Sequence, residues 1–292
     1  MVSLRLSIAG FVIDLINESE LPIKLEDGYS SFVLDDSTVK PSVQVLVHSG
    51  VPDSLRAATI PIYSADFEGK TLWEIFRSED ELRFHVFNSN SPYELQQVAK
   101  LNADLTVWDI YSEPVLDAQK SVLFPLLYPM GPLVMYYLTA KFDAIMIHGS
   151  GISYNGLGRI FTGVSGQGKT TMAKLWFDSG AEVINDDRLI IRNENGTYQV
   201  YNTPMFYQDE QRSVELKAIY SIHHSKKNTL TKTEGVNAVA GVTPNLIQHG
   251  YAKDLISHHL RFVMQMIDTI PVYKLGVVPN NSVVEFIRDY DR

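Results

Sequence analysis

The sequence predicts a mixed α/β protein, in which a β-rich N-terminal module (residues 1–113) precedes an α/β domain (residues 114–292). Two observations predict this fold class. Short runs of alternating or β-branched residues occupy the first third of the chain. Residues 159–192 then show the pattern of a strand, a glycine-rich loop, a helix and a second strand. The length of 292 residues exceeds one ordinary domain, and 45% hydrophobic residues suffice for a substantial core.

Charge and composition narrow the classes of function. A net charge of −9 without any basic stripe argues against a nucleic-acid partner. The sequence contains no cysteine, so disulfides and cysteine-based metal sites are excluded. The apolar run in residues 1–18 is broken and too short for a signal peptide or a membrane span. We therefore expect a cytoplasmic protein without a membrane partner. The sequence is compatible with a homo-oligomer as well as with a monomer.

The N-terminal module is expected to be antiparallel and rich in short strands. Its predicted strands are residues 7–15, 31–34, 42–48, 82–88 and 105–111. No grouping of acids, histidines or glycines in this module indicates a catalytic site. By elimination, we interpret the module as a docking surface for a substrate or partner.

Residues 117–142 differ in character because they are strongly apolar. Asp117 is placed to cap a helix, and Pro125, Pro129 and Pro132 divide the run. Two short helices are therefore expected, packing within the C-terminal domain. The uninterrupted apolar stretches are too short for a membrane span.

A phosphate-binding motif follows three predicted strands, residues 144–148, 152–154 and 159–162. The turn at 155–158, Asn-Gly-Leu-Gly, predicts a hairpin between the last two. Residues 163–170, Gly-Val-Ser-Gly-Gln-Gly-Lys-Thr, match the P-loop (Walker A) pattern. Its glycines let backbone N–H groups point at phosphate oxygens, and the following helix start adds partial positive charge. Lys169 is expected to reach the terminal phosphates, and the Thr170 hydroxyl to bind Mg²⁺.

Two adjacent aspartates come directly after the next predicted strand. The helix after the motif is stopped by Gly180, and residues 181–185 form a strand that ends at Asp186 and Asp187. A right-handed crossover returns this strand parallel to the strand before the motif. Both carboxylates are then expected at the sheet edge that carries the glycine-rich loop. One of the two acids would bind the metal ion, and the other would act as the general base that accepts the proton of a substrate hydroxyl. The sequence does not say which acid has which role.

The rest of the chain predicts further strands and helices of this domain. Strands are expected at residues 188–192, 215–221 and 272–277, helices at 243–246 and 253–269, and a short helix or edge strand at 282–288. Residues 201–212 are expected near the acids if the sheet continues, with Arg212 either a phosphate contact or a surface residue. The pairs His223-His224 and His258-His259 do not suit one shared ion, because neighbouring side chains on a strand point to opposite faces.

Together, these motifs resemble the HPr kinase/phosphorylase family. The resemblance rests on His148-Gly149, on the hairpin at 155–158, on GVSGQGKTT, and on Gly-Ala-Glu-Val-Ile-Asn-Asp-Asp at 180–187. The resemblance is good over residues 145–203. It extends to HPr-kinase-like proteins that occur with peptide-modification pathways, such as lasso-peptide tailoring. The family shares a phosphate-loop core with phosphoenolpyruvate carboxykinase. The resemblance thus implies a P-loop nucleotide-binding domain of the HPr-kinase/carboxykinase type.

The resemblance also implies roles for the matching residues. Lys169 and Thr170 bind phosphate and Mg²⁺, one acid of Asp186-Asp187 is the base while the other supports the metal, and His148 tunes their protonation. The family places a glutamate where this sequence has Thr171, and its second glycine-rich signature is missing. The implied activity is therefore the kinase reaction, and these departures leave the phosphorylase reaction and HPr as the acceptor open.

The sequence thus predicts an ATP- and Mg²⁺-dependent kinase that phosphorylates a hydroxyl, best a serine, of a protein or peptide. ATP and GTP are not distinguished. A carboxykinase-like enzyme or small-molecule kinase is the first alternative, and a non-catalytic nucleotide sensor is the second. The predicted catalytic residues are His148, Lys169, Asp186 and Asp187, with Thr170 and Asp186 as metal ligands. The predicted nucleotide-binding residues are Gly163, Ser165, Gly166, Gln167, Gly168, Lys169, Thr170 and Thr171.

Overall fold

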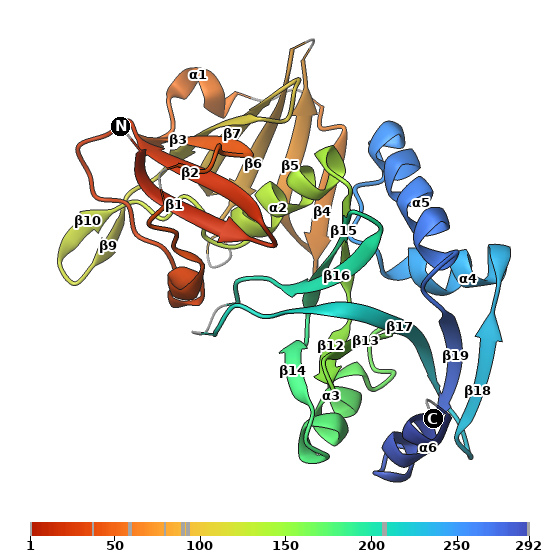
Figure 1. The fold of residues 1–292 in the computed structure, drawn as a ribbon. Helices are drawn as coiled ribbons and strands as arrows, with labels where there is room; N and C mark the ends of the chain where they lie inside the picture. Colours follow the sequence, from red (N-terminus) through yellow and green to blue (C-terminus); the bar gives the residue numbers. More distant parts are fainter. Residues whose placement is uncertain are drawn as a thin grey trace. The chain divides into compact units, whose positions relative to one another are not determined.

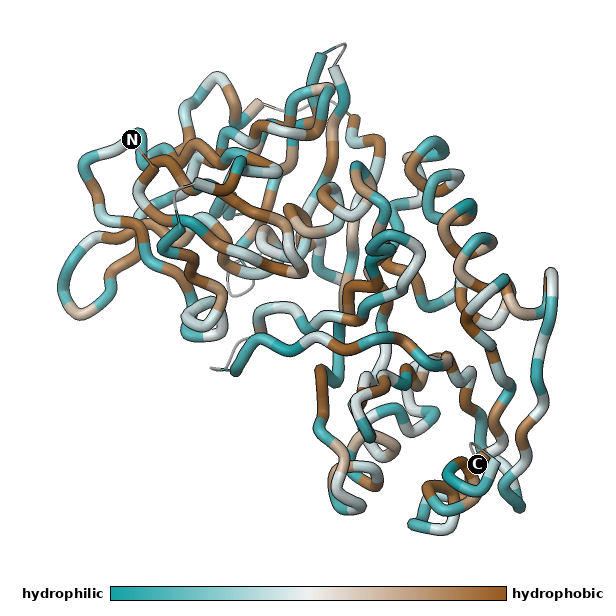
Figure 2. The backbone as a smooth tube through the Cα atoms, viewed as in Figure 1, coloured by the Kyte–Doolittle hydropathy of each residue, from teal (hydrophilic) through white to brown (hydrophobic). Residues whose placement is uncertain are grey.

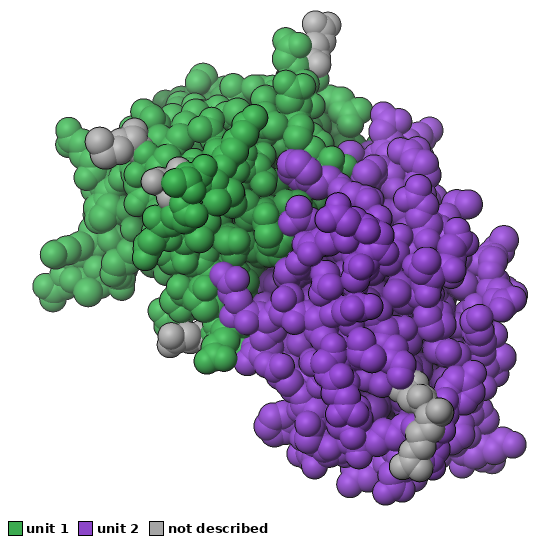
Figure 3. Space-filling model, in the orientation of Figure 1, with its two compact units in different colours: residues 1–141, 204–210, 249–251 green, residues 142–203, 211–248, 252–292 purple. Residues whose placement is uncertain are grey.

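The computed structural model describes residues 2–36, 38–57, 60–78, 80–88, 91, 94–205 and 209–290. In this part of the chain, the strands form an eight-stranded sheet, a nine-stranded sheet and a separate two-stranded hairpin (Figure 1). The fold is therefore mixed α/β. Contacts divide the chain into unit 1, which is Met1–Lys141, Pro204–Glu210 and His249–Tyr251, and unit 2, which is Phe142–Thr203, Gln211–Gln248 and Ala252–Arg292 (Figure 3).

Unit 1 contains the eight-stranded sheet, in the order β1-β2-β3-β8-β7-β6-β5-β4. The strands are β1 (Val2–Ile8), β2 (Phe11–Asn17), β3 (Val43–Ser49), β4 (Tyr63–Phe67), β5 (Lys70–Arg77), β6 (Glu81–Phe87), β7 (Leu95–Asn102) and β8 (Val107–Ser112). The expectation of an antiparallel module was wrong, because β3 runs parallel to both β2 and β8. A long connection that contains the 3₁₀ helix η1 (Asp27–Phe32) joins β2 to β3, and long connections permit parallel neighbours.

Two details of unit 1 differ from the sequence prediction. The single strand expected at 7–15 is a hairpin of β1 and β2, whose turn residues Ala9 and Gly10 have φ of 52° and 72°. Such positive φ values are what a tight two-residue hairpin turn requires. A strand was expected at residues 31–34, but the first two of these residues form the end of η1.

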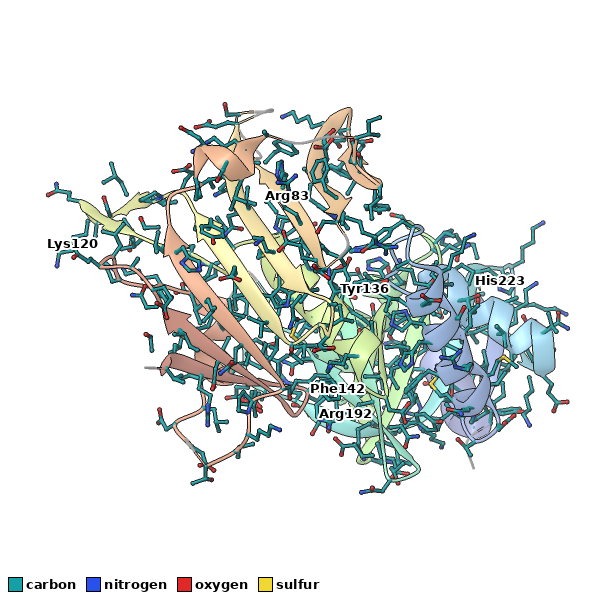
Figure 4. All side chains as sticks on the ribbon, turned by 90° about the horizontal axis from the view of Figure 1, so that it is seen from above. Arg83, Lys120, Tyr136, Phe142, Arg192 and His223 are labelled. Atoms are coloured by element: carbon teal, nitrogen blue, oxygen red, sulfur yellow. The ribbon has the colours of Figure 1, made fainter. Side chains whose placement is uncertain are left out.

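The segment after β8 forms a hairpin and one helix, where two short helices were expected. Asp117 does not cap a helix, because it ends β9 (Val115–Asp117), which pairs with β10 (Lys120–Val122). The helix α2 (Met130–Lys141) follows, and Tyr137 within it packs against Phe84 and Trp108 of the sheet. Tyr136, labelled in Figure 4, accepts a hydrogen bond from the backbone N–H of His249. Residues 114–141 therefore belong to unit 1, whereas the sequence analysis assigned them to the C-terminal domain.

Unit 2 contains the nine-stranded sheet, whose main path is β11-β15-β16-β17-β13-β12-β14, with β19 beside β17 and β18 beside β19. Its strands are β11 (Ala144–His148), β12 (Ser150–Tyr154), β13 (Leu157–Thr162), β14 (Glu182–Asn185), β15 (Arg188–Glu194), β16 (Thr197–Asn202), β17 (Ser213–His224), β18 (Thr229–Thr233) and β19 (Val272–Val277). The parallel pairs β13–β17 and β17–β19 bring three strand ends to one edge. The expected hairpin at 155–158 is confirmed, with Asn155 and Gly156 at positive φ.

Helices of unit 2 pack in two separate apolar clusters of the sheet. Its helices are α3 (Lys169–Asp178), α4 (Gly235–Val242), the 3₁₀ helix η2 (Thr243–Asn245), α5 (Lys253–Ile267) and α6 (Ser282–Tyr290). One cluster holds residues of α4 and α5 such as Val242 and Phe262, and the other holds residues of α3 and α6 such as Trp176 and Ile287. Figure 2 shows apolar residues along the strands that these helices cover. Burial of this apolar surface is the main stabilisation of the unit.

The sequence analysis missed α4 and β18. The α4 sequence, Gly-Val-Asn-Ala-Val-Ala-Gly-Val, consists largely of glycine and valine, which favour helix poorly. None of the helices in the described part of the chain is both long enough and apolar enough to cross a membrane.

Candidate functional site

The loop of the predicted phosphate-binding motif, residues 163–168, is called the phosphate loop below, and it joins β13 to α3 as the motif predicts. Gly163 has φ of 156°, and a Cβ atom on it would lie 2.5 Å from Oε1 of Gln167 and 3.1 Å from the carbonyl oxygen of Ile222. A side chain there would be strained by this φ and would displace the Gln167 side chain. Gly168, with φ of 97°, is the N-cap of α3 and provides no side-chain hydrogen bond to it. The first N–H groups of the helix therefore lack a side-chain cap, an arrangement that favours a bound anion.

Lys169, the first residue of α3, turns its ammonium group back over the loop. Its Nζ donates a hydrogen bond to the carbonyl oxygen of Gly163 at 3.0 Å. Partial burial lowers the pKa of Lys169, while the carboxylates of Asp186 and Asp187 act in the opposite direction. Because both carboxylates influence this ammonium group, the acid pair and the phosphate loop belong to one electrostatic site.

Three hydroxyl groups of the motif lie at the surface of this site. Ser165 in the loop and Thr170 and Thr171 in the first turn of α3 are exposed. An exposed hydroxyl at the start of the helix is a hard oxygen donor of the kind that Mg²⁺ binds.

The start of β12 separates the strand before the loop from the strand before the acids. β12 pairs antiparallel with β13 on one side and with β14 on the other, with Ser150 opposite Phe161 and Gly151 opposite Asn185. Strands β13 and β14 therefore run in the same direction, which confirms the expected parallel return. They are not neighbours, because β12 lies between them. The phosphate loop and the acid pair both follow strand ends at this edge.

Asp187 is held between two basic side chains. Nδ1 of His148 lies 3.2 Å from Oδ1 of Asp187, and Nη2 of Arg188 lies 3.3 Å from its Oδ2. Burial alone would raise the pKa of Asp187, but the hydrogen bond from His148 and the charges of Arg188, His148 and Lys169 outweigh it and lower that pKa. Asp187 is therefore held in its ionised form.

Asp186 has a different partner. The hydroxyl of Ser150 donates a hydrogen bond to Oδ1 of Asp186, and Ser150 is fully buried. The sequence analysis did not single out Ser150. The one sequence feature that could have pointed to Ser150 is its position directly after His148 and Gly149. A neutral donor leaves the charge of Asp186 less compensated than that of Asp187, so Asp186 is the better partner for a cation.

A buried set of hydrogen bonds fixes the turn that carries the acids. The backbone N–H of Asp187 donates to Oδ1 of Asn185 at 3.1 Å, and Nδ2 of Asn185 donates to the carbonyl oxygen of Thr203 at 3.2 Å. The hydroxyl of Thr203 in turn donates to the carbonyl oxygen of Arg188 at 3.1 Å. Thr203 thus lies next to the acid turn, as expected for the segment after β16.

Arg212 lies away from the carboxyl end of β14. Its Nε donates to Oε1 of Glu182 at 2.9 Å, and Glu182 is the first residue of β14, whereas the acids follow its last. Among the described contacts, Arg212 is therefore paired with the end of β14 that lies away from the acids, and its contact with phosphate stays a prediction.

One histidine that the sequence analysis set aside does contact the loop. Nε2 of His224, at the end of β17, lies 3.2 Å from the carbonyl oxygen of Gly166. Its neighbour His223, labelled in Figure 4, has a buried Nδ1 atom that finds no hydrogen-bond partner among the described residues. In α5, His258 lies 3.0 Å from the carbonyl oxygen of Phe142 through Nε2. Among the described residues, no group of three or more His, Asp or Glu side chains could hold a metal by itself.

Comparisons with known proteins add little to this site. No family model matches the chain, and no curated protein matches it. Among solved structures, the HPr(Ser) kinase/phosphatase from Coxiella burnetii matches with 12% sequence identity and a TM-score of 0.30. The match covers 50% of this chain and 95% of the other. The function therefore has to rest on the site's own residues.

Proposed function

We propose that unit 2 binds Mg·ATP on the phosphate loop and transfers its γ-phosphate to a hydroxyl of a protein or peptide, best a serine. The observation that carries this proposal is geometric: the glycine-rich loop with Lys169 and the turn with Asp186 and Asp187 follow strands β13 and β14, which flank β12 and run in the same direction. A nucleotide-binding loop alone needs no pair of carboxylates beside its lysine. A phosphotransferase does, because it needs one acid for the metal and one for the acceptor proton.

The residues present fit a nucleotide with Mg²⁺. The uncapped helix start and Lys169 offer N–H groups and positive charge to phosphate oxygens. The Thr170 hydroxyl and the Asp186 carboxylate are hard oxygen donors, the type that Mg²⁺ prefers. Bound Mg²⁺ would neutralise charge on the phosphate oxygens during transfer. Ser150 would hold Asp186 in place for this role.

Asp187 would accept the proton of the acceptor hydroxyl, with His148 beside it. Nδ1 of His148 lies 3.2 Å from Oδ1 of Asp187, so the imidazole orients this carboxylate. The lowered pKa of Asp187 keeps the carboxylate ionised and able to accept a proton. The acceptor class follows from the resemblance of residues 145–203 to HPr-kinase-like proteins, and docking of that acceptor is assigned to the β-rich module.

Isothermal titration of Mg·ATP and an ATP-turnover assay test the proposal. Lys169→Ala is expected to abolish measurable binding, whereas Lys174→Ala, which removes an exposed lysine from the same helix, leaves it unchanged. Asp187→Asn is expected to reduce turnover by about 10² to 10⁴, the usual contribution of a general base. Asp178→Asn, an exposed aspartate at the end of α3, is the matched control.

Each outcome separates the alternatives. Tight binding without turnover that depends on Asp187, in the presence of candidate peptide acceptors, would favour a nucleotide sensor. Transfer to a small metabolite and not to a peptide would favour a small-molecule kinase. No binding of either ATP or GTP would overturn the proposal.

A further inference from the structure

The end of β17 lies directly beside the phosphate loop. β17 is parallel to β13, and Ser221 pairs with Thr162, the last residue before the loop. The strand then continues to His224, three residues beyond this register position. The carbonyl oxygen of Ile222 lies 3.1 Å from the point where a Cβ of Gly163 would stand. The loop therefore runs along the last residues of β17.

The backbone of His224 is held firmly. It pairs with Val277 in β19, and the N–H of Ser225 donates to the carbonyl oxygen of Val277 at 3.1 Å. Asn228, in the turn that follows, accepts a hydrogen bond from the N–H of Val278 and donates one to the Ser282 hydroxyl. The imidazole of His224 is thus presented from a paired strand end, which is a more rigid support than a loop.

The contact partner of His224 is the tip of the loop. Gly166 has φ of 82°, and a Cβ built on it would meet no atom within 4 Å, so packing does not restrain this residue. Nε2 of His224 lies 3.2 Å from its carbonyl oxygen, a distance at which the imidazole donates a hydrogen bond. On the other side of the same peptide group, the N–H of Gln167 donates to the carbonyl oxygen of Val164 at 3.3 Å.

These two hydrogen bonds fix the orientation of one peptide group. In a trans peptide the C=O and the N–H point in opposite directions, so a donor on the carbonyl also sets where the N–H points. In a phosphate loop, the direction of the N–H groups decides how well the loop receives phosphate oxygens. A side chain that holds the Gly166 carbonyl from outside therefore acts on phosphate binding without touching the phosphate.

We propose that His224 is a positioning residue of the phosphate loop, which holds the Gly166–Gln167 peptide in the turn from Val164 to Gln167 and so keeps the N–H groups that follow it directed at the phosphates of a nucleoside triphosphate. This inference rests on the proposed function, since it concerns the same loop. It assigns the end of β17 to the nucleotide site. The hydrogen bond to Gly166 carries the role, and the ring needs no particular charge, because both the neutral Nε2–H tautomer and the protonated ring can donate.

Two variants of His224 and one neighbouring control test this. His224→Ala is expected to weaken the binding of Mg·ATP, and of tripolyphosphate alone, by about fivefold to tenfold, the effect of one hydrogen bond. KM for ATP rises by the same factor, while kcat changes by less than about twofold, because the acids and Lys169 keep their places. His224→Gln keeps an N–H donor at a similar reach and is expected to restore most of the binding. Lys226→Ala removes a nearby exposed charge and leaves binding within about twofold.

A measurement without nucleotide separates this inference from the proposed function. In the free protein, the amide resonance of Gln167 is expected to shift in His224→Ala and to return toward its wild-type position in His224→Gln. Equal binding by His224→Ala and wild type would overturn the positioning role and leave the kinase proposal intact. An equal loss in the Ala and Gln variants, or in Lys226→Ala, would show that something other than this hydrogen bond acts. Failure of the wild type to bind ATP would remove both proposals.

Discussion

Nδ1 of His148 lies 3.2 Å from Oδ1 of Asp187, and His148 is paired across the sheet with Arg188, whose Nη2 lies 3.3 Å from Oδ2 of the same carboxylate. One register position of β11 and β15 therefore supplies both basic partners of Asp187. The acid turn is anchored to these two strands as well as to β14, which explains why its carboxylate is ionised although it is partly buried.

The lowered pKa of Asp187 makes a prediction about stability and pH. A carboxyl group whose pKa in the folded state lies below its ordinary value of 3.8 stabilises the fold above that pH, and the contribution is lost as the pH falls through the folded value. Asp187→Asn is therefore expected to lower the free energy of unfolding by about 1 kcal/mol at pH 7. Below about pH 4 the difference from wild type shrinks, because the carboxyl group becomes protonated in both the folded and the unfolded state.

Urea unfolding of both proteins between pH 3 and pH 7 measures this difference. The control is Asp178→Asn, which changes an exposed aspartate in the same unit and is expected to have an effect near zero. A difference that does not shrink as the pH falls from 4 to 3 would contradict the assignment of Asp187 as the ionised partner of His148 and Arg188.

Ser150 is predicted to matter for the metal more than for the fold. Ser150→Ala removes the hydroxyl that donates to Asp186, so that carboxylate loses its hydrogen-bonded orientation. We expect the Mg²⁺ concentration for half-maximal turnover to rise about tenfold, in line with the loss of an outer hydrogen bond at a metal site. Ser153→Ala, on the same strand β12, is the control. An unchanged Mg²⁺ requirement would argue that Asp186 is not a metal ligand.

Even the methyl group of an alanine at position 163 is predicted to disturb the phosphate loop. Gly163→Ala would place a Cβ 2.5 Å from Oε1 of Gln167 and 3.1 Å from the backbone of Ile222. We expect a loss of about 1–3 kcal/mol of stability, or a displaced loop and lost ATP binding if the loop moves instead. Gly241 in α4 is the matched case, since its added Cβ would make ordinary contacts from 3.5 Å onward. Gly241→Ala should be neutral or stabilising by about 0.5–1 kcal/mol. Thermal unfolding and ATP titration of the two variants test this contrast.

The sequence was sufficient for the local course of the chain through the site. The glycine spacing of the motif, the helix stop at Gly180 and the short apolar run before Asp186 predict β13, the loop, α3 and β14 in their observed order. These elements are encoded by neighbouring residues, through turn chemistry and apolar periodicity. The connections between these elements are also short, which limits the number of ways in which the elements can be arranged in space.

The rest depends on contacts between residues far apart in the sequence. The insertion of β12 between β13 and β14 comes from sheet pairing, which no local pattern specifies. His224 contacts Gly166 because β17 pairs in parallel with β13 and extends beyond it. The helix start predicted at Asp117 was wrong because Ala118 and Gln119 adopt positive φ values, 44° and 67°, that their residue types seldom show. Their turn makes a hairpin where Asp117 suggested a helix cap.

Thr170 and Thr171 provide a last prediction, because they are adjacent, chemically identical and both exposed at the start of α3. Only Thr170 stands at the motif position whose hydroxyl binds Mg²⁺. Thr170→Ala is therefore expected to lower turnover by at least tenfold and to raise the Mg²⁺ requirement, whereas Thr170→Ser retains the hydroxyl and most of the activity. Thr171→Ala should stay within about threefold of wild type, since it keeps the backbone N–H group that Thr171 contributes at the helix start. Titration of Mg²⁺ in the turnover assay separates the two positions. Equal losses at both would show that the first turn of α3 acts through its conformation, and that the Thr170 hydroxyl is not a metal ligand.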